Sequence, residues 1–112
     1  MEFLSLKKKF DEFFHIDEKK KEGAAYIRSA IQKLDAKEHS MGLSEEFIEV
    51  IKQQEPFYLY TYVSINQTNG DAPIIMMGFN LAETEDDEGM FDYELIYDAY
   101  GNFIDEKIIK KY

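Results

Sequence analysis

The sequence predicts an α+β fold, in which two to three N-terminal helices pack on one face of a four-stranded antiparallel sheet built as a meander. Two observations support this fold class. Apolar residues recur at three- and four-residue spacing through residues 1–55, which is typical of amphipathic helices. Residues 57–110 instead show alternating or continuous apolar runs between turn residues, which is typical of strands and hairpins.

The length and composition predict one folded domain. A chain of 112 residues with 45% hydrophobic residues can bury a single core over residues 1–112, helical over 1–55 and sheet over 57–110. The absence of cysteine excludes disulfides and thiolate chemistry. No apolar run suits a signal peptide, and none approaches the roughly 20 residues of a membrane helix. We therefore expect a soluble, cytoplasmic protein.

Three helices are expected in the first half of the chain. The first spans residues 2–15, and the second runs from an N-cap at Asp17 to about Ala36. Ser44 is the predicted N-cap of a short third helix over residues 45–54. The predicted apolar stripes of the first two helices consist of Phe3, Leu6, Phe10 and Phe13, and of Ala24, Ile27, Ala30, Ile31 and Leu34.

Four strands are expected in the second half. Residues 57–66 alternate most clearly, and a turn at Asn69-Gly70 follows them. Residues 72–80 are apolar on both faces, as a central strand is. Residues 91–98 and 103–109 form the third and fourth predicted strands, with a turn between them.

The first strand carries a row of tyrosines. Alternate residues of a strand point to opposite faces, so Tyr58, Tyr60 and Tyr62 are expected on one face. The predicted core-facing set is Phe57, Leu59, Thr61, Val63 and Ile65. With helices on the core side, the tyrosines lie beside the acidic side of the third strand, which carries Asp92, Glu94 and Asp98. Tyrosines are enriched at interfaces, whereas the alternative is ordinary cross-strand aromatic pairing on a solvated face.

A run of carboxylates separates the second and third predicted strands. It comprises Glu83, Glu85, Asp86, Asp87 and Glu88. We interpret this run as a solvated loop, because it lacks the alternating ligand spacing and central glycine of a calcium-binding EF-hand loop. Its residues join the tyrosines and the acids of the third strand as candidate partner-binding residues.

The charge of the chain is acidic and unevenly distributed. The formal net charge is -10, and it arises in residues 41–112, where four lysines face fifteen Asp and Glu residues. Residues 1–40 carry nine basic and eight acidic residues, a net charge of +1. Such acidity argues against binding nucleic acid or anionic membranes and favours a basic protein partner. The other interpretation is that the charge only keeps the protein soluble.

No motif predicts catalysis, a metal or a cofactor. The two histidines, His15 and His39, lack the spacing of a zinc site. The sequence contains no Gly-x-Ser-x-Gly, no phosphate-binding loop and no dinucleotide-binding fingerprint. We therefore expect a binding protein rather than an enzyme.

Taken together, a short, cysteine-free, acidic α+β chain with the Tyr58/Tyr60/Tyr62 row, the acids Asp92, Glu94 and Asp98, and no catalytic motif resembles, in kind, the bacterial immunity proteins. These proteins neutralise toxins, often nucleases. The resemblance implies a monomer or homodimer that occludes the cationic active cleft of a basic toxin domain and does not itself contact nucleic acid.

Three alternatives remain open at the level of the sequence. One is a nucleic-acid mimic that inhibits a defence enzyme. Another is a small enzyme or ligand-binding domain with a pocket around Tyr26, Met76, Met77 and Phe79. The last is a homodimer joined through the tyrosine face.

Overall fold

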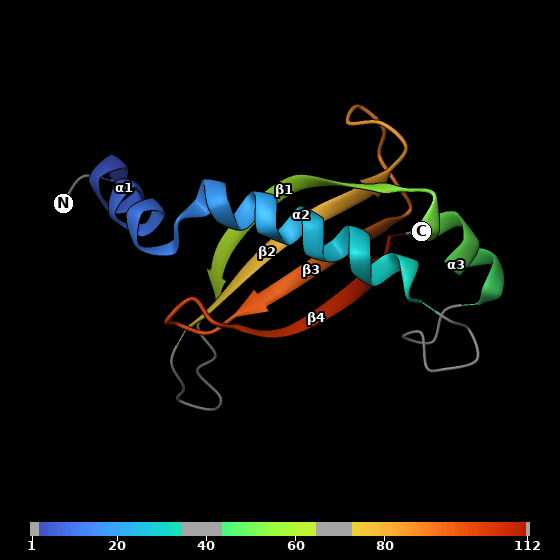
Figure 1. The fold of residues 1–112 in the computed structure, drawn as a ribbon. Helices are drawn as coiled ribbons and strands as arrows, with labels where there is room; N and C mark the ends of the chain where they lie inside the picture. The colour runs from blue at the N-terminus through green and yellow to red at the C-terminus, as the bar shows by residue number, and fades with distance from the viewer. Residues whose placement is uncertain (1–2, 35–43, 65–72, 112) are drawn as a thin grey trace.

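The strands of the protein form one antiparallel sheet, and its helices lie on one side of that sheet (Figure 1). The computed structural model describes residues 3–34, 44–64 and 73–111. The strand order is β1-β2-β3-β4, so the sheet is a meander with β1 and β4 at its edges. The strands are β1 Glu55–Ser64, β2 Ile74–Ala82, β3 Phe91–Tyr97 and β4 Phe103–Lys110. The predicted α+β fold class is confirmed.

The three described helices are α1 Phe3–Phe14, α2 Ile16–Gln32 and α3 Glu45–Lys52. The predicted cap of α3 is confirmed, because Ser44 Oγ accepts a hydrogen bond from the Phe47 N–H at 3.3 Å. The predicted cap at Asp17 is wrong. His15 occupies the N-cap position of α2 in a left-handed backbone conformation, with φ 57°. The turn expected at Asn69-Gly70 lies outside the described residues.

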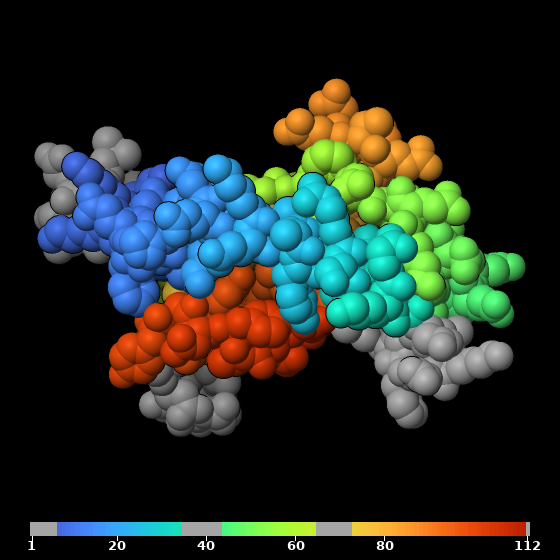
Figure 2. All heavy atoms as spheres, in the orientation of Figure 1, coloured from blue at the N-terminus to red at the C-terminus, as the bar shows by residue number. Residues whose placement is uncertain are grey.

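Helix α2 supplies most of the cover over the sheet, and it runs across the strands in Figures 1 and 2. Its residues Ile27 and Ile31 are fully buried in a core cluster with Met77 and Phe79 of β2. A Cβ on Gly23 would lie 2.9 Å from Cζ of Phe79, so glycine allows this close approach of helix to sheet. The predicted apolar stripe of α2 therefore forms the centre of the core.

Helix α1 projects beyond the sheet and is anchored at its C-terminal end (Figure 1). Phe14 is 1% exposed and packs edge-on against Tyr97 at a ring-centroid distance of 5.1 Å, and Phe10 packs against the same core cluster. The predicted Phe13 is 52% exposed, so its placement in the apolar stripe is wrong. The break at His15 sets how α1 approaches the sheet, and helical spacing alone does not predict that break.

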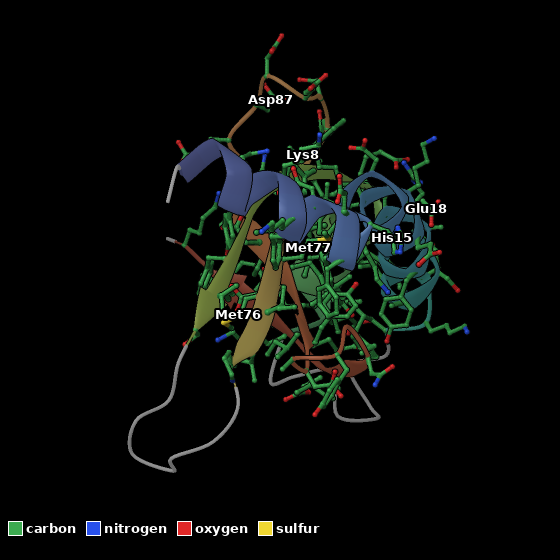
Figure 3. The ribbon with its side chains drawn as sticks, turned by 90° about the vertical axis from the view of Figure 1, so that its left-hand side faces the viewer. Lys8, His15, Glu18, Met76, Met77 and Asp87 are labelled. Carbon is green, nitrogen blue, oxygen red and sulfur yellow. The ribbon has the colours of Figure 1, made fainter. Side chains whose placement is uncertain are left out.

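Strand β2 is apolar on both sides, as predicted for a central strand. Met77 faces the helices and is fully buried, whereas Met76 points to the other side of the sheet (Figure 3). We call this second side the open face, because no helix that the structure describes lies on it (Figure 1). By strand register, its side chains are those of Glu55, Phe57, Tyr60, Tyr62, Ser64, Ile74, Met76, Asn80, Ala82, Asp92, Glu94, Ile96, Asp105, Lys107 and Ile109.

A β-bulge in β1 divides the tyrosine row between the two faces. Tyr58 pairs with Phe79 and Tyr60 pairs with Gly78, so Leu59 is an extra residue in the strand. Beyond the bulge, Tyr60 lies on the open face, but Tyr58 packs against the helix-covered core. The prediction that the three tyrosines share one face is therefore wrong for Tyr58. The same shift moves Phe57 out of the predicted core-facing set.

Gly78 is required on the open face because the ring of Tyr60 lies directly over it. A Cβ at Gly78 would lie 2.1 Å from Cζ of Tyr60. We expect Gly78→Ala to lower the free energy of unfolding by about 1–3 kcal/mol, because the ring must move. In a Tyr60→Ala background the same change should cost much less, which chemical denaturation of the four variants measures as a coupling energy. Equal costs in both backgrounds would show that the ring is not the cause.

Candidate protein-binding surfaces

The open face contains a buried carboxylate. Glu94 is 2% exposed, and its Oε2 accepts a hydrogen bond from the Tyr60 hydroxyl at 2.9 Å. Its Oε1 lies 3.3 Å from Nζ of Lys107 on β4. Burial, and then the bond to Glu94, raise the pKa of the Tyr60 phenol. The Glu94 carboxylate is thus enclosed by groups of its own chain.

The second predicted carboxylate on this face is also paired within the chain. Asp92 Oδ1 lies 3.1 Å from Nζ of Lys111, which also donates to Oδ1 of Asn80 at 3.3 Å. Asp92 Oδ1 and Glu94 Oε1 are buried and accept no hydrogen bond of good geometry from the described residues, so each contact with lysine is an ion pair. The open face therefore offers a basic partner little unpaired negative charge from these two residues.

Asp98, the third predicted acid of this group, has a structural role in the turn between β3 and β4. Its Oδ1 accepts hydrogen bonds from the N–H groups of Tyr100 and Asn102, both at 2.9 Å. The bond from the Asn102 backbone is the main cause that lowers the pKa of Asp98. The carboxylate thus closes the turn and is not aligned with Tyr60 and Tyr62.

The predicted acidic loop is anchored to the sheet by Asn80. The Asn80 Nδ2 group donates to the carbonyl oxygen of Asp87 at 2.7 Å, and its Oδ1 accepts from the Gly89 N–H at 3.0 Å. Gly89 itself approaches the backbone so closely that a Cβ there would lie 1.7 Å from the carbonyl oxygen of Leu81. The loop is therefore held at both of these points while its side chains face solvent.

We call the surface formed by this loop and α3 the acidic end of the molecule (Figures 1 and 2). A groove of about 310 Å³ runs between the loop and α3, lined by the apolar side chains of Val50 and Met90. These two side chains are 42% and 40% exposed. The acidic end comprises Val50, Met90, Glu83, Glu85, Asp86, Asp87 and Glu88. The ion pairs between described residues involve none of these carboxylates.

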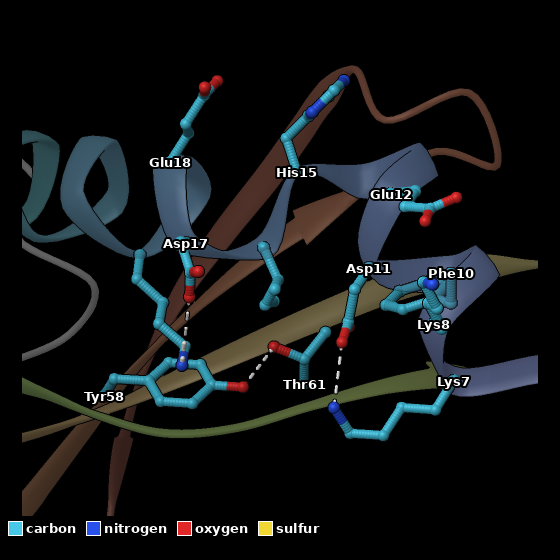
Figure 4. A pocket seen from close by; sticks show the side chains of 12 residues that line it. Lys7, Lys8, Phe10, Asp11, Glu12, His15, Asp17, Glu18, Tyr58 and Thr61 are labelled. Carbon is cyan, nitrogen blue, oxygen red and sulfur yellow. Dashed lines mark hydrogen bonds and ion pairs between the residues drawn. The ribbon is translucent and has the colours of Figure 1, made fainter. Parts of the chain in front are cut away.

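A larger cleft of about 1180 Å³ lies between α1, the start of α2 and β1, and it holds Tyr58 (Figure 4). The Tyr58 hydroxyl shares a hydrogen bond of 2.7 Å with Thr61 Oγ1, and Lys20 Nζ lies 4.3 Å from the ring centroid. His15 lines the cleft but points away from Tyr58 in Figure 4. Lys20 Nζ is also 4.0 Å from Asp17 Oδ1, so this lysine contacts both the ring of Tyr58 and a carboxylate.

The pocket considered around Tyr26, Met76, Met77 and Phe79 is not formed. Met77 and Phe79 are core residues, Met76 faces the other side of the sheet, and Tyr26 lies at the surface with 41% of its area exposed. The Tyr26 hydroxyl instead donates to Glu106 of β4, which also accepts from the buried Tyr93. In the described parts of the chain, no three His, Asp or Glu side chains gather to hold a metal ion.

Comparison with known proteins does not place this chain in a family. No family model, curated protein or solved structure matches it. Among the helices that the structure describes, none has both the length and the apolar composition to cross a membrane. The geometry of the acidic end and of the open face is what bears on function.

The anchor at Asn80 is testable. We expect Asn80→Ala to lower the free energy of unfolding by about 1–3 kcal/mol, because it removes the part-buried hydrogen bonds to the Asp87 carbonyl and from the Gly89 N–H. Hydrogen exchange of residues 83–90 should become faster. Thr84→Ala, which changes an exposed side chain in the same loop, should leave the free energy of unfolding and the rate of hydrogen exchange nearly unchanged. Unaltered exchange in Asn80→Ala would mean that other contacts hold the loop.

Stability should decline at alkaline pH because of the tyrosines. Burial is the main cause that raises the pKa of Tyr26 and of Tyr97 to about 12, from an ordinary value of 10.0, and it also raises the pKa of Tyr93. The folded state therefore binds these protons more tightly than the unfolded state. Their contribution to stability is complete below pH 10 and is lost as the pH rises towards 12.

Tyrosinate absorbance and denaturant unfolding, both followed against pH, measure this decline. Tyr26→Phe should remove part of it, since a phenylalanine has no proton to lose. Complete tyrosine ionisation near pH 10 in a protein that stays folded would contradict the assignment.

Proposed function

We propose that this chain is a small acidic protein-binding module that neutralises a basic protein. Its proposed mode of action is that of the bacterial immunity proteins it resembles in kind, which is to cover the cationic active cleft of a toxin domain. The observation that supports this proposal best is the acidic end, where one loop carries five exposed carboxylates and three of them, Glu83, Asp87 and Glu88, line a groove with an apolar centre.

The acidic end has the composition of a recognition surface for basic side chains. Protein interfaces commonly combine an apolar centre with a polar rim, and here Val50 and Met90 provide the centre. A lysine or arginine of the partner can lay its aliphatic stem on such a centre while its charged head reaches the rim. The loop carboxylates form no ion pair with another described residue, so they would be available to basic side chains of the partner.

The loop is also suited to fast association. Electrostatic attraction between a -10 chain and a basic protein raises the rate of encounter, most strongly at low ionic strength. Because Asn80 and Gly89 anchor the loop, less conformational entropy is lost when a partner orders its side chains. Among the candidate residues of the sequence, this proposal therefore relies on the loop acids more than on Asp92 and Glu94.

The test is a charge reversal with a control of equal net charge. The variant Glu83→Lys/Asp87→Lys/Glu88→Lys changes the acidic end. The control Glu12→Lys/Glu18→Lys/Glu22→Lys makes the same change of charge on exposed positions of α1 and α2. Wild-type protein is used as bait in host lysate, the captured basic protein is identified and purified, and association is followed at several salt concentrations.

At low salt, the acidic-end variant should associate at least about tenfold more slowly than wild type, and the control should be affected far less. At roughly 1 M salt the difference should shrink, because the screening length falls to about 3 Å. Co-expression of wild type should also block the toxicity or enzymatic activity of the captured protein. Equal slowing by both variants, or capture of no basic protein, would contradict the proposal.

A further inference from the structure

The open face is a second surface, and it differs from the acidic end in being largely apolar. One face of an antiparallel sheet is ordinarily polar when it borders water. Here each of the four strands instead places apolar side chains on it. They include Tyr60, Tyr62, Ile74, Met76, Ile96 and Ile109. Tyr62 is 46% exposed, so its ring is available for contact.

The charges on this face are nearly balanced. Asp92 is paired with Lys111, and Glu94 with Lys107, so each ion pair is neutral as a whole. Glu55, at one end of the face, is paired with Arg28, and Asp105 adds one further negative charge by strand register. On a chain of net charge -10, this face is thus a region with about one net charge. A basic partner gains little attraction here, whereas an equally neutral and apolar surface is not repelled at short range.

We propose that the open face is where two copies of this chain associate, sheet against sheet, about a two-fold axis. Sheets with apolar faces commonly cover one another in this way, about 10 Å apart. A two-fold axis places the same surface of each copy in the interface, so the neutral apolar face of one copy contacts the identical face of the other. The dimer would have outer helix layers and two inner sheets, and β2 would then be covered on both of its apolar sides.

The size of the face sets the expected strength of this dimer. Four strands at about 4.8 Å spacing and the seven residues of β3 give a patch of roughly 19 by 23 Å. Its projected area of about 440 Å² is smaller than the roughly 800 Å² per partner of a standard interface. We therefore expect a weak dimer with a dissociation constant in roughly the micromolar range, so that the fraction of dimer rises with protein concentration.

The response to salt distinguishes this dimerisation from the binding of a basic partner. Two chains of charge -10 repel each other at a distance, and added salt screens that repulsion. Burial of apolar surface is not weakened by the same screening. Dimerisation should therefore strengthen as salt rises, whereas binding of a basic protein to the acidic end should weaken. The two proposals can fail independently.

Sedimentation of the purified chain from about 1 µM to about 500 µM tests the proposal, at about 50 mM and about 500 mM salt. Wild type should shift from monomer to dimer with concentration, and more so at the higher salt. Tyr62→Thr/Ile96→Thr should weaken dimerisation by at least about tenfold, because it removes apolar area and keeps strand-favouring side chains. Circular dichroism confirms that each variant is folded.

The matched control is Val63→Thr/Phe103→Thr, which alters two exposed apolar residues that lie on the helix-covered side of the sheet by strand register. It should leave dimerisation unchanged. A wild-type chain that stays monomeric throughout at the higher salt would overturn the proposal. So would a dimer that Tyr62→Thr/Ile96→Thr does not weaken, or one that the control weakens equally, as pairing through the edge of β4 would predict.

Discussion

The open face of the sheet depends on one contact that joins three strands. Tyr60 of β1 crosses Gly78 of β2 and donates a hydrogen bond to Glu94 of β3. A buried carboxylate is costly unless hydrogen bonds and an opposite charge compensate it, and here Tyr60 and Lys107 do so. Glu94 is therefore a structural group. Its charge is used to hold β1, β3 and β4 together, and it is not free for a partner.

Much of the fold could be predicted from periodicity, because burial on one side of a helix or strand imposes a spacing on apolar residues. Two features could not. The bulge at Leu59 inserts one residue and reverses which face Tyr58 and Phe57 occupy, and an apolar residue at that point fits a regular strand equally well. The left-handed backbone of His15 likewise brings Phe14 into the core.

The candidate site residues divide in the same way, into those that the local sequence predicts and those whose role depends on the folded structure. The acidic loop follows from local sequence, since a run of carboxylates between two strands has to remain in solvent. The pairing of Asp92 and Glu94 does not, because their lysines lie on or just beyond β4 and reach them only once β3 and β4 are in register. The anchoring role of Asn80 depends equally on the folded loop.

The placement of so few lysines explains how one small acidic chain can present two different surfaces. In residues 41–112 there are only four lysines, and two of them, Lys107 and Lys111, are used on the open face. There they cancel the carboxylates that would otherwise make that face acidic, and its apolar side chains become the dominant feature. The acidic loop lies on the other side of Asn80. Its carboxylates take part in none of the ion pairs between described residues, so the loop keeps its negative charge. Under the two proposals, ionic strength acts in opposite directions on the two surfaces, since screening weakens attraction at one and repulsion at the other.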